Sequence, residues 1–299
     1  MRSLLVLAAA AASFVPAAPA AAPQTGSVRT LYVTAAAADG SPLASLEAAD
    51  LVVKEGDRAR TVVRVEPSRA KLKVAIAVEE LLTPDGDVRR AVANFIDRIR
   101  ESGELALYTV GRRTEKRVDY TSQIVPFATA INSFPVRAVD PGDLVQALQE
   151  IARHQRSLEG RHAIVAVATQ TAQTSSTTAE GVLEQLTGGR TVLYAATLAG
   201  SETSTIPAGS TSGGRRLDLE GQVSGLERDK IFNNGTRQTG GLHLSSQRLA
   251  GLWNALERIA AELRQQYVVS YEGDVKSDGS VTVEAARRGI ILRGPTRVR

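Results

Sequence analysis

The stretch Leu72-Lys-Val-Ala-Ile-Ala-Val78 decides the fold class, because it is an almost uninterrupted apolar run of strand length. A strand that is buried on both faces of a parallel sheet has this composition, whereas a half-exposed strand alternates apolar and polar residues. Apolar residues then recur at helical spacing from Val88 to Ile99, with Asp85 and Asp87 in the expected first turn. The stretch therefore predicts the first β-α unit of an α/β domain.

The same alternation of buried strands and amphipathic helices continues to residue 200. The predicted strands are residues 105–110, 117–121, 163–168 and 191–197, and the predicted helices are residues 124–134, 142–158 and 179–186. This order predicts a doubly wound, mostly parallel, Rossmann-like sheet in residues 71–200, completed by a last segment and helix in residues 236–266. Between these two parts, the Ser- and Thr-rich residues 200–235 predict a flexible insertion.

Short strands with tight turns precede and follow the α/β domain. Residues 27–70 contain the turn dipeptide Asp39-Gly40. Residues 267–299 are predicted to form a β-hairpin and further strands, with residues 267–271 and 280–285 pairing around Asp278-Gly279. Alternating polarity is typical of antiparallel sheets with one solvated face. We therefore expect the N-terminal and C-terminal segments to combine into one small antiparallel β-domain.

Residues 1–22 predict a secretory signal peptide. Arg2 is the only charged residue before Arg29, the apolar run 4–12 is too short to span a bilayer, and small residues fill positions 17–22. A disordered Ala/Pro leader is the alternative interpretation. Because no later apolar stretch approaches about 18 residues, the mature protein is expected to be periplasmic or extracellular, with no membrane insertion after signal removal.

Composition narrows the possible functions. The 299 residues carry a formal net charge of +4, spread along the whole length, and only 4% are aromatic. Neither a phosphate-tracking stripe nor stacking platforms are recognisable, so nucleic-acid binding is not predicted. The chain has no cysteine, which excludes disulfides, thiolate metal sites and thiol catalysis.

Three stretches resemble the von Willebrand factor A (vWA)-related proteins of the acidobacterial type. They are residues 40–57, which contain Glu55-Gly56-Asp57, then Thr239-Gly240-Gly241, and residues 259–271, which contain Glu262-Leu263-Arg264 and Tyr267. The resemblance covers nearly all of the mature chain. It implies a vWA-like fold for the α/β domain.

The resemblance also implies a metal-ion-dependent adhesion site (MIDAS), in which a D-x-S-x-S loop, a Thr and a second Asp hold Mg²⁺ at the carboxyl edge of the sheet. In this sequence the corresponding positions are Glu79, Leu81, Thr83, Gly142 or Asp143, and Thr169. Leu81 offers no oxygen and Thr169 offers no carboxylate, which leaves too few hard ligands to replace the water around Mg²⁺. The sequence therefore predicts a degenerate site, with no metal and no other cofactor.

These observations favour an exported, non-catalytic protein–protein interaction module, acting in adhesion or as a scaffold, with a partner that the sequence does not identify. A first alternative is cation-dependent adhesion through a rearranged site that uses Glu79, Thr83, Asp143 and Thr169. A second is a hydrolase. No G-x-S-x-G motif supports it, and His154, His162 and His243 do not have the spacing of a zinc site.

Overall fold

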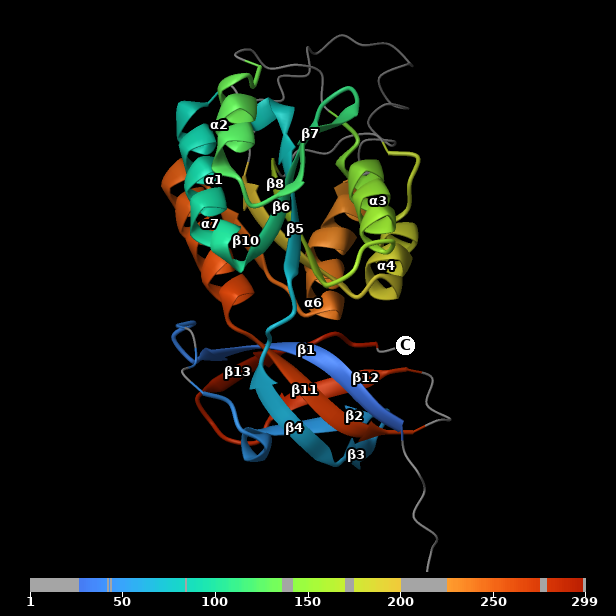
Figure 1. The fold of residues 1–299 in the computed structure, drawn as a ribbon. Coiled ribbons are helices and arrows are strands. Elements are labelled where there is room, and N and C mark those ends of the chain that lie inside the picture. Colours follow the sequence, from blue (N-terminus) through green and yellow to red (C-terminus); the bar gives the residue numbers. More distant parts are fainter. Residues whose placement is uncertain are drawn as a thin grey trace, which may run out of the picture.

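The computed structural model describes residues 27–41, 43, 45–83, 85–135, 142–169, 175–199, 225–274 and 279–297. The predicted signal peptide and residues 200–224 of the predicted insertion lie outside the described residues. Figure 1 shows an α/β domain stacked on a smaller β-domain, with the described C-terminal residues near the junction.

The α/β domain is built on a six-stranded sheet with the strand order β10-β9-β8-β5-β6-β7. Its strands are β5 (Leu72–Glu79), β6 (Gly103–Val110), β7 (Thr114–Thr121), β8 (Arg161–Thr169), β9 (Thr191–Leu198) and β10 (His243–Ser246). Its pairings are parallel, except that β7 runs antiparallel to β6. The predicted doubly wound, mostly parallel fold is confirmed. Of the strands in this sheet, only the short β10 was not predicted.

Helices cover both faces of this sheet (Figure 1). One face packs against α1 (Gly86–Ile99), α2 (Ile124–Asn132) and α7 (Leu249–Arg264), and the other against α3 (Leu144–Gln155), α4 (Ala179–Gly188) and the π-helix Ile231–Gly235, which leads into α6 (Thr236–Thr239). The Asp85 side chain caps α1 by accepting from the amides of Asp87 and Val88 at 2.7 and 3.4 Å. Asp85 thus satisfies amides that a helix start leaves unpaired.

The prediction of a flexible insertion is wrong for residues 225–235. Residues 225–230 are α-helical and continue directly into the π-helix. The physical reason is burial, because Arg228, Ile231 and Phe232 recur at helical spacing and are at most 4% exposed. The Ser- and Thr-rich composition that suggested a loop belongs to the residues before 225.

The β-domain combines the two ends of the chain, as predicted. One sheet has the order β13-β1-β11-β4 and the other has the order β12-β2-β3. The strands are β1 (Ser27–Ala37), β2 (Leu51–Glu55), β3 (Arg58–Arg60), β4 (Val62–Pro67), β11 (Gln266–Gly273), β12 (Val281–Ala285) and β13 (Ile290–Arg293). Antiparallel pairing of β1 with β11 runs from Ser27↔Gly273 to Thr34↔Gln266, so the N-terminal and C-terminal segments share one sheet.

The predicted hairpin between residues 267–271 and 280–285 is wrong. These segments, β11 and β12, lie in different sheets. β11 has β1 on one edge and β4 on the other, so neither of its edges is open to β12, which pairs with β2 instead. Alternating polarity predicted the strands correctly but does not specify their partners.

A polar junction joins the two domains. Glu262 on α7 forms an ion pair with Arg293 on β13, and the Glu262 side chain is 5% exposed. Arg161 on β8 donates to the side chain of Gln266 on β11 at 2.7 Å, and Gln266 in turn lies 3.3 Å from the Tyr194 hydroxyl. Buried polar groups with such directional partners fix the position of one domain on the other.

Candidate functional site

The candidate site lies where the strand order of the α/β sheet reverses. β5 is flanked by β6 on one side and by β8 on the other, and the crevice outside such a switch point is where open α/β sheets bind ligands. β5 ends at Glu79 and β8 ends at Thr169, and the two strands pair in parallel up to Val78↔Val167. In Figure 1, this edge is the end of the α/β domain that points away from the β-domain.

Glu79 is the centre of a buried polar cluster at this edge. One carboxylate oxygen, Oε2, accepts from the amide and the hydroxyl of Thr169 at 2.6 and 3.0 Å. The other oxygen, Oε1, accepts from Nη2 of Arg228 at 2.6 Å. Nη2 also donates to the Thr169 carbonyl oxygen at 2.6 Å. With exposed side-chain fractions of 1% for Glu79 and 4% for Arg228, the guanidinium supplies the buried positive charge that balances the carboxylate.

Glu227, next to Arg228, attaches this helical segment to the start of α4. The Glu227 carboxylate accepts from the Ala179 amide at 2.6 Å, at the start of α4, and pairs with Lys230 at 2.7 Å. The Ala179 amide first, and Lys230 second, hold the pKa of Glu227 below its usual range. The Arg228 guanidinium also lies 5.4 Å from the centre of the Phe232 ring, within the range of a cation–π contact.

The two predicted Ser positions of the metal loop contribute no free oxygen. Leu81 lies in the 3₁₀-helix Glu80–Leu82 and is half-buried. Thr83 is fully buried, and its hydroxyl donates to the Glu80 carbonyl oxygen at 2.8 Å. The Thr83 hydroxyl therefore stabilises the turn after β5 and makes no hydrogen bond with Glu79.

The predicted Thr position also lacks a free ligand. A Cβ atom on Gly142 would lie 2.0 Å from the Gly111 carbonyl oxygen, so a threonine there would require the backbone to move. Asp143 caps α3 by accepting from the Gln146 amide at 2.9 Å, while its second oxygen accepts from the Ser175 hydroxyl at 2.8 Å. Both Asp143 oxygens thus hold the start of α3 in place.

Of the six sequence-predicted positions, the cluster unites Glu79 and Thr169. Their oxygens do not fit a Mg²⁺ ion, because Arg228 and Thr169 already bind the single carboxylate and Mg²⁺ needs near-octahedral oxygen coordination. Arg228, which follows Glu79 by 149 residues, is not among the positions predicted from the sequence. Its helical spacing from Ile231 and Phe232 was the signal that could have identified it as buried.

A second polar array joins β9, β10 and the π-helix. Nε2 of His243 is 2.9 Å from the Thr197 hydroxyl, and Nδ1 is 3.0 Å from the Asn233 side-chain oxygen. Burial lowers the pKa of His243. The order hydroxyl, imidazole and amide resembles that of a nucleophile, a base and an orienting group. Thr197 is fully buried, however, so its hydroxyl does not face a surface that a substrate can reach.

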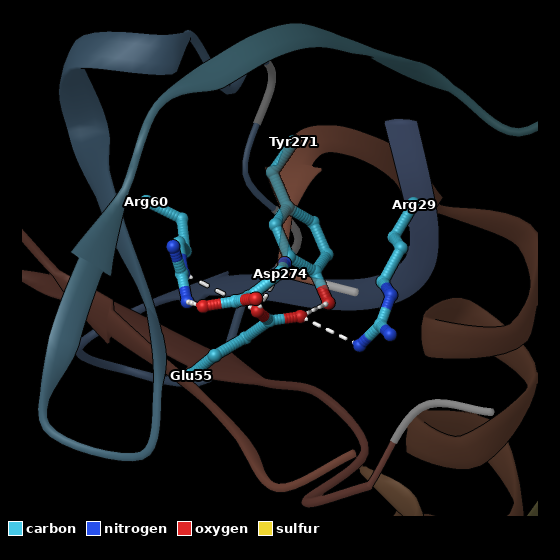
Figure 2. A network of polar contacts seen from close by, with 5 residues as sticks. All are labelled: Arg29, Glu55, Arg60, Tyr271 and Asp274. Atoms are coloured by element: carbon cyan, nitrogen blue, oxygen red, sulfur yellow. Dashed lines mark hydrogen bonds and ion pairs between the residues drawn. The ribbon is translucent and has the colours of Figure 1, made fainter. Parts of the chain in front are cut away.

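The first stretch that resembles vWA-related proteins has a structural role, shown in Figure 2. The Glu55 carboxylate accepts from Arg29 at 2.8 Å and from the Tyr271 hydroxyl at 3.0 Å on Oε1. Its Oε2 accepts from the Asp274 amide at 2.8 Å and pairs with Arg60 at 3.2 Å. Burial, followed by the Glu55 charge, raises the pKa of Tyr271 to about 12, so its hydroxyl stays a donor at neutral pH.

The Thr239-Gly240-Gly241 stretch is also structural. The Thr239 hydroxyl accepts from the Leu193 amide at 3.0 Å, and Gly240 has a φ of +82°, which favours glycine. A Cβ atom on Gly241 would lie 1.9 Å from the Leu193 carbonyl oxygen. These residues allow the chain to pass close to β9 before β10 begins.

Several solved structures are similar to this chain at low sequence identity. An aerotolerance-related membrane protein from Bacteroides fragilis is 12% identical, with a TM-score of 0.40 over 63% of this chain and 98% of its own. The SpRpn10 VWA domain is 13% identical, with a TM-score of 0.41 over 64% of this chain and 97% of its own. Proximal thread matrix protein 1 from the mussel byssus, with a zinc-occupied MIDAS motif, is 11% identical. Its TM-score is 0.46 over 70% of this chain and 49% of its own.

These similarities are too distant to transfer a ligand, a partner or an activity to this chain. No protein-family model matches the sequence, and no curated protein matches it. Within the described residues, none of the helices combines the length and the apolar character needed to cross a membrane.

Proposed function

We propose that this protein is an exported, non-catalytic protein-interaction module that works without a divalent cation. Arg228 carries the proposal. Its guanidinium binds the carboxylate that stands at the first metal-ligand position, so the charge that Mg²⁺ would otherwise balance is already balanced from within the chain.

Electrostatics at the carboxyl edge supports cation independence. A divalent ion bound to Glu79 would have to displace the Arg228 guanidinium or lie beside it, and like charges repel strongly where water is excluded. The oxygens that a rearranged metal site would use already have hydrogen-bond partners within the chain, since the Thr83 hydroxyl donates to Glu80 and Asp143 caps α3. The Thr169 hydroxyl is itself bonded to Glu79.

The absence of catalysis is proposed from the burial of Thr197, the one described hydroxyl that is placed like a nucleophile. The Thr197, His243 and Asn233 array has the order of a catalytic triad, but a threonine nucleophile must reach a substrate carbonyl. Complete burial of Thr197 prevents this in the described conformation. Export rests on the predicted signal peptide, and a protein partner rests on the resemblance to vWA-related proteins.

The test compares partner capture with and without divalent cations. The full mature chain is immobilised, exposed to the exported protein fraction in 2 mM MgCl₂ or in EDTA, and the captured proteins are quantified by mass spectrometry; the main one is then purified for a binding titration. We expect the same partner and equal affinity in both buffers. Capture that disappears in EDTA would instead support cation-dependent adhesion, and turnover in a broad hydrolase screen would contradict the non-catalytic assignment.

A further inference from the structure

A cavity of about 430 Å³ opens at the junction of the two domains. The α/β domain lines it with Asn233, Arg237 and His243, and the β-domain lines it with Val283, Leu292 and Thr296. We call it the seam cavity, because it lies along the seam between β12 and β13. Its position, at the end of the α/β domain opposite Glu79, makes it separate from the candidate site described above.

Two strand edges border the seam cavity. β12 is the last strand of one sheet of the β-domain and β13 is the last strand of the other. They are held together at one end, where the Val281 amide donates to the Thr296 carbonyl oxygen at 2.9 Å and Ser280 forms an isolated bridge with Arg297. Beyond that point, the described residues pair with each strand on one edge only, the edge in its own sheet.

The register of β12 sets which backbone groups face the seam. Gly56 donates to the Ser280 carbonyl oxygen at 3.3 Å, and Ala286 donates to the Asp50 carbonyl oxygen at 2.8 Å. In an antiparallel pair, every second residue of a strand forms backbone hydrogen bonds with the partner strand. The even-numbered residues between Ser280 and Ala286 therefore bond to β2. Val283 and Ala285 therefore turn their amide and carbonyl groups toward the seam. Unpaired groups of this kind are a template for a further strand.

The charge of the seam cavity points to an acidic occupant. Arg237 and Arg293 line it, and no Asp or Glu is among the described residues that line it. Arg293 is balanced by Glu262. Arg237, in contrast, donates at 2.6 Å to the neutral side chain of Asn234 and is exposed. Its positive charge is thus available to a carboxylate.

We propose that the seam cavity binds an extended acidic peptide segment of a partner protein. The segment adds as a strand to the free edge of β12, its apolar side chains contact Val283 and Leu292, and its carboxylate pairs with Arg237. Strand addition of this kind takes its affinity from backbone hydrogen bonds and its specificity from alternate side chains. The inference rests on the proposed function in one respect, namely that the partner is a protein.

Fluorescence polarisation with a defined probe tests the proposal on the full mature chain. The probe is the tetramethylrhodamine-labelled peptide Gly-Thr-Val-Asp-Val-Thr, and its neutral counterpart carries Asn in place of Asp. We expect the acidic probe to bind at least tenfold more tightly than the neutral one. Arg237→Gln should remove that preference, whereas Arg248→Gln, at an exposed arginine outside the lining of the seam cavity, should leave it intact.

A second variant tests strand addition itself. Ala285→Pro removes an amide that faces the seam, and proline is tolerated where an edge-strand amide is unpaired. We expect this variant to keep the wild-type melting temperature and to bind the acidic probe at least tenfold more weakly.

Three results would overturn the proposal. They are equal binding of the two probes, full binding by the proline variant, and displacement of the probe by free succinate at equal affinity, which would indicate a small-carboxylate site. Each of these results overturns only the peptide site in the seam cavity. The proposed function still holds if the protein captures its partner in EDTA.

Discussion

Two buried glutamates, one in each domain, are neutralised in different ways. Among the described residues, Glu79 has a single cationic partner, Arg228, and both side chains are at most 4% exposed. Glu55 has two, Arg29 and Arg60, which are 20% and 18% exposed, and it also accepts from Tyr271 and a backbone amide. The charge balance of Glu79 therefore depends on one residue, whereas that of Glu55 is shared among several.

The difference shows where the molecule is sensitive to change. Removing one partner of a fully buried ion pair leaves an uncompensated charge in the interior, which is far more costly than removing one donor of several. In the β-domain, water can reach the arginines around Glu55 and replace part of a lost contact. At the carboxyl edge of the α/β sheet, Arg228 is the one described residue that balances the charge of Glu79.

The largest effect is expected for Arg228→Ala. It leaves Glu79 buried with only the donors of Thr169, so we expect a loss of about 3–5 kcal/mol in the free energy of unfolding, measured by urea denaturation. The double variant Glu79→Leu with Arg228→Met removes both charges and should recover most of that loss. If the single and double variants are equally unstable, the ion pair is not the cause.

A rebuilt metal site would show whether Arg228 stands in for a cation. The triple variant Leu81→Ser, Thr169→Asp and Arg228→Ala restores the oxygens and removes the guanidinium. We expect Mg²⁺ or Mn²⁺ to raise its melting temperature, with about 2.7 kcal/mol of stabilisation at 100 times the dissociation constant. The wild type should show no change. A cation-dependent rise in the wild type that disappears in Glu79→Ala would support the rearranged site instead.

A smaller effect is expected for Arg29→Ala in the β-domain. Glu55 keeps Arg60, Tyr271 and the Asp274 amide, so we expect a loss of about 1 kcal/mol, measured by the same denaturation. Arg64→Ala is the matched control on an exposed arginine, 68% exposed, and should change the free energy of unfolding least. A loss as large as that of Arg228→Ala would remove the distinction between the two glutamates.

The smallest effect concerns pH. Burial is the main cause that lowers the pKa values of His162 and His243 below their usual range. The unfolded chain then binds more protons than the folded one below about pH 6.5, so the free energy of unfolding should fall as the pH drops from 7 to 5. Denaturation of His162→Gln across this range should show a weaker dependence. An unchanged slope would mean that this histidine does not contribute.

The fold could be predicted from the sequence because its strands and helices have distinct hydrophobic periods. The apolar run 72–78 and the alternation in residues 267–271 predicted a parallel and an antiparallel sheet in the right places. Strand partners could not be predicted in the same way. Both edges of β11 are taken by β1 and β4, and this depends on contacts between segments far apart in the sequence.

The candidate site could be predicted only in part. Aligning the ends of β5 and β8 was enough to bring Glu79 and Thr169 together, since the carboxyl ends of adjacent parallel strands meet. Arg228 was hidden because the segment before it is Ser- and Thr-rich and no local motif links it to Glu79. Gly142 shows a further limit, since its contact with Gly111 is set by packing rather than by chain neighbours.

The position of β1 has a consequence for how the chain is made. β1 is the first described strand, and its two neighbours, β11 and β13, come from the other end of the chain. During synthesis, β1 must remain without either partner until residues 266–293 have emerged, and contacts of such long range also slow folding. A nascent chain released early would carry two open strand edges, which favour aggregation. The β-domain can therefore close only near the end of synthesis, after the segments of the α/β domain have already emerged.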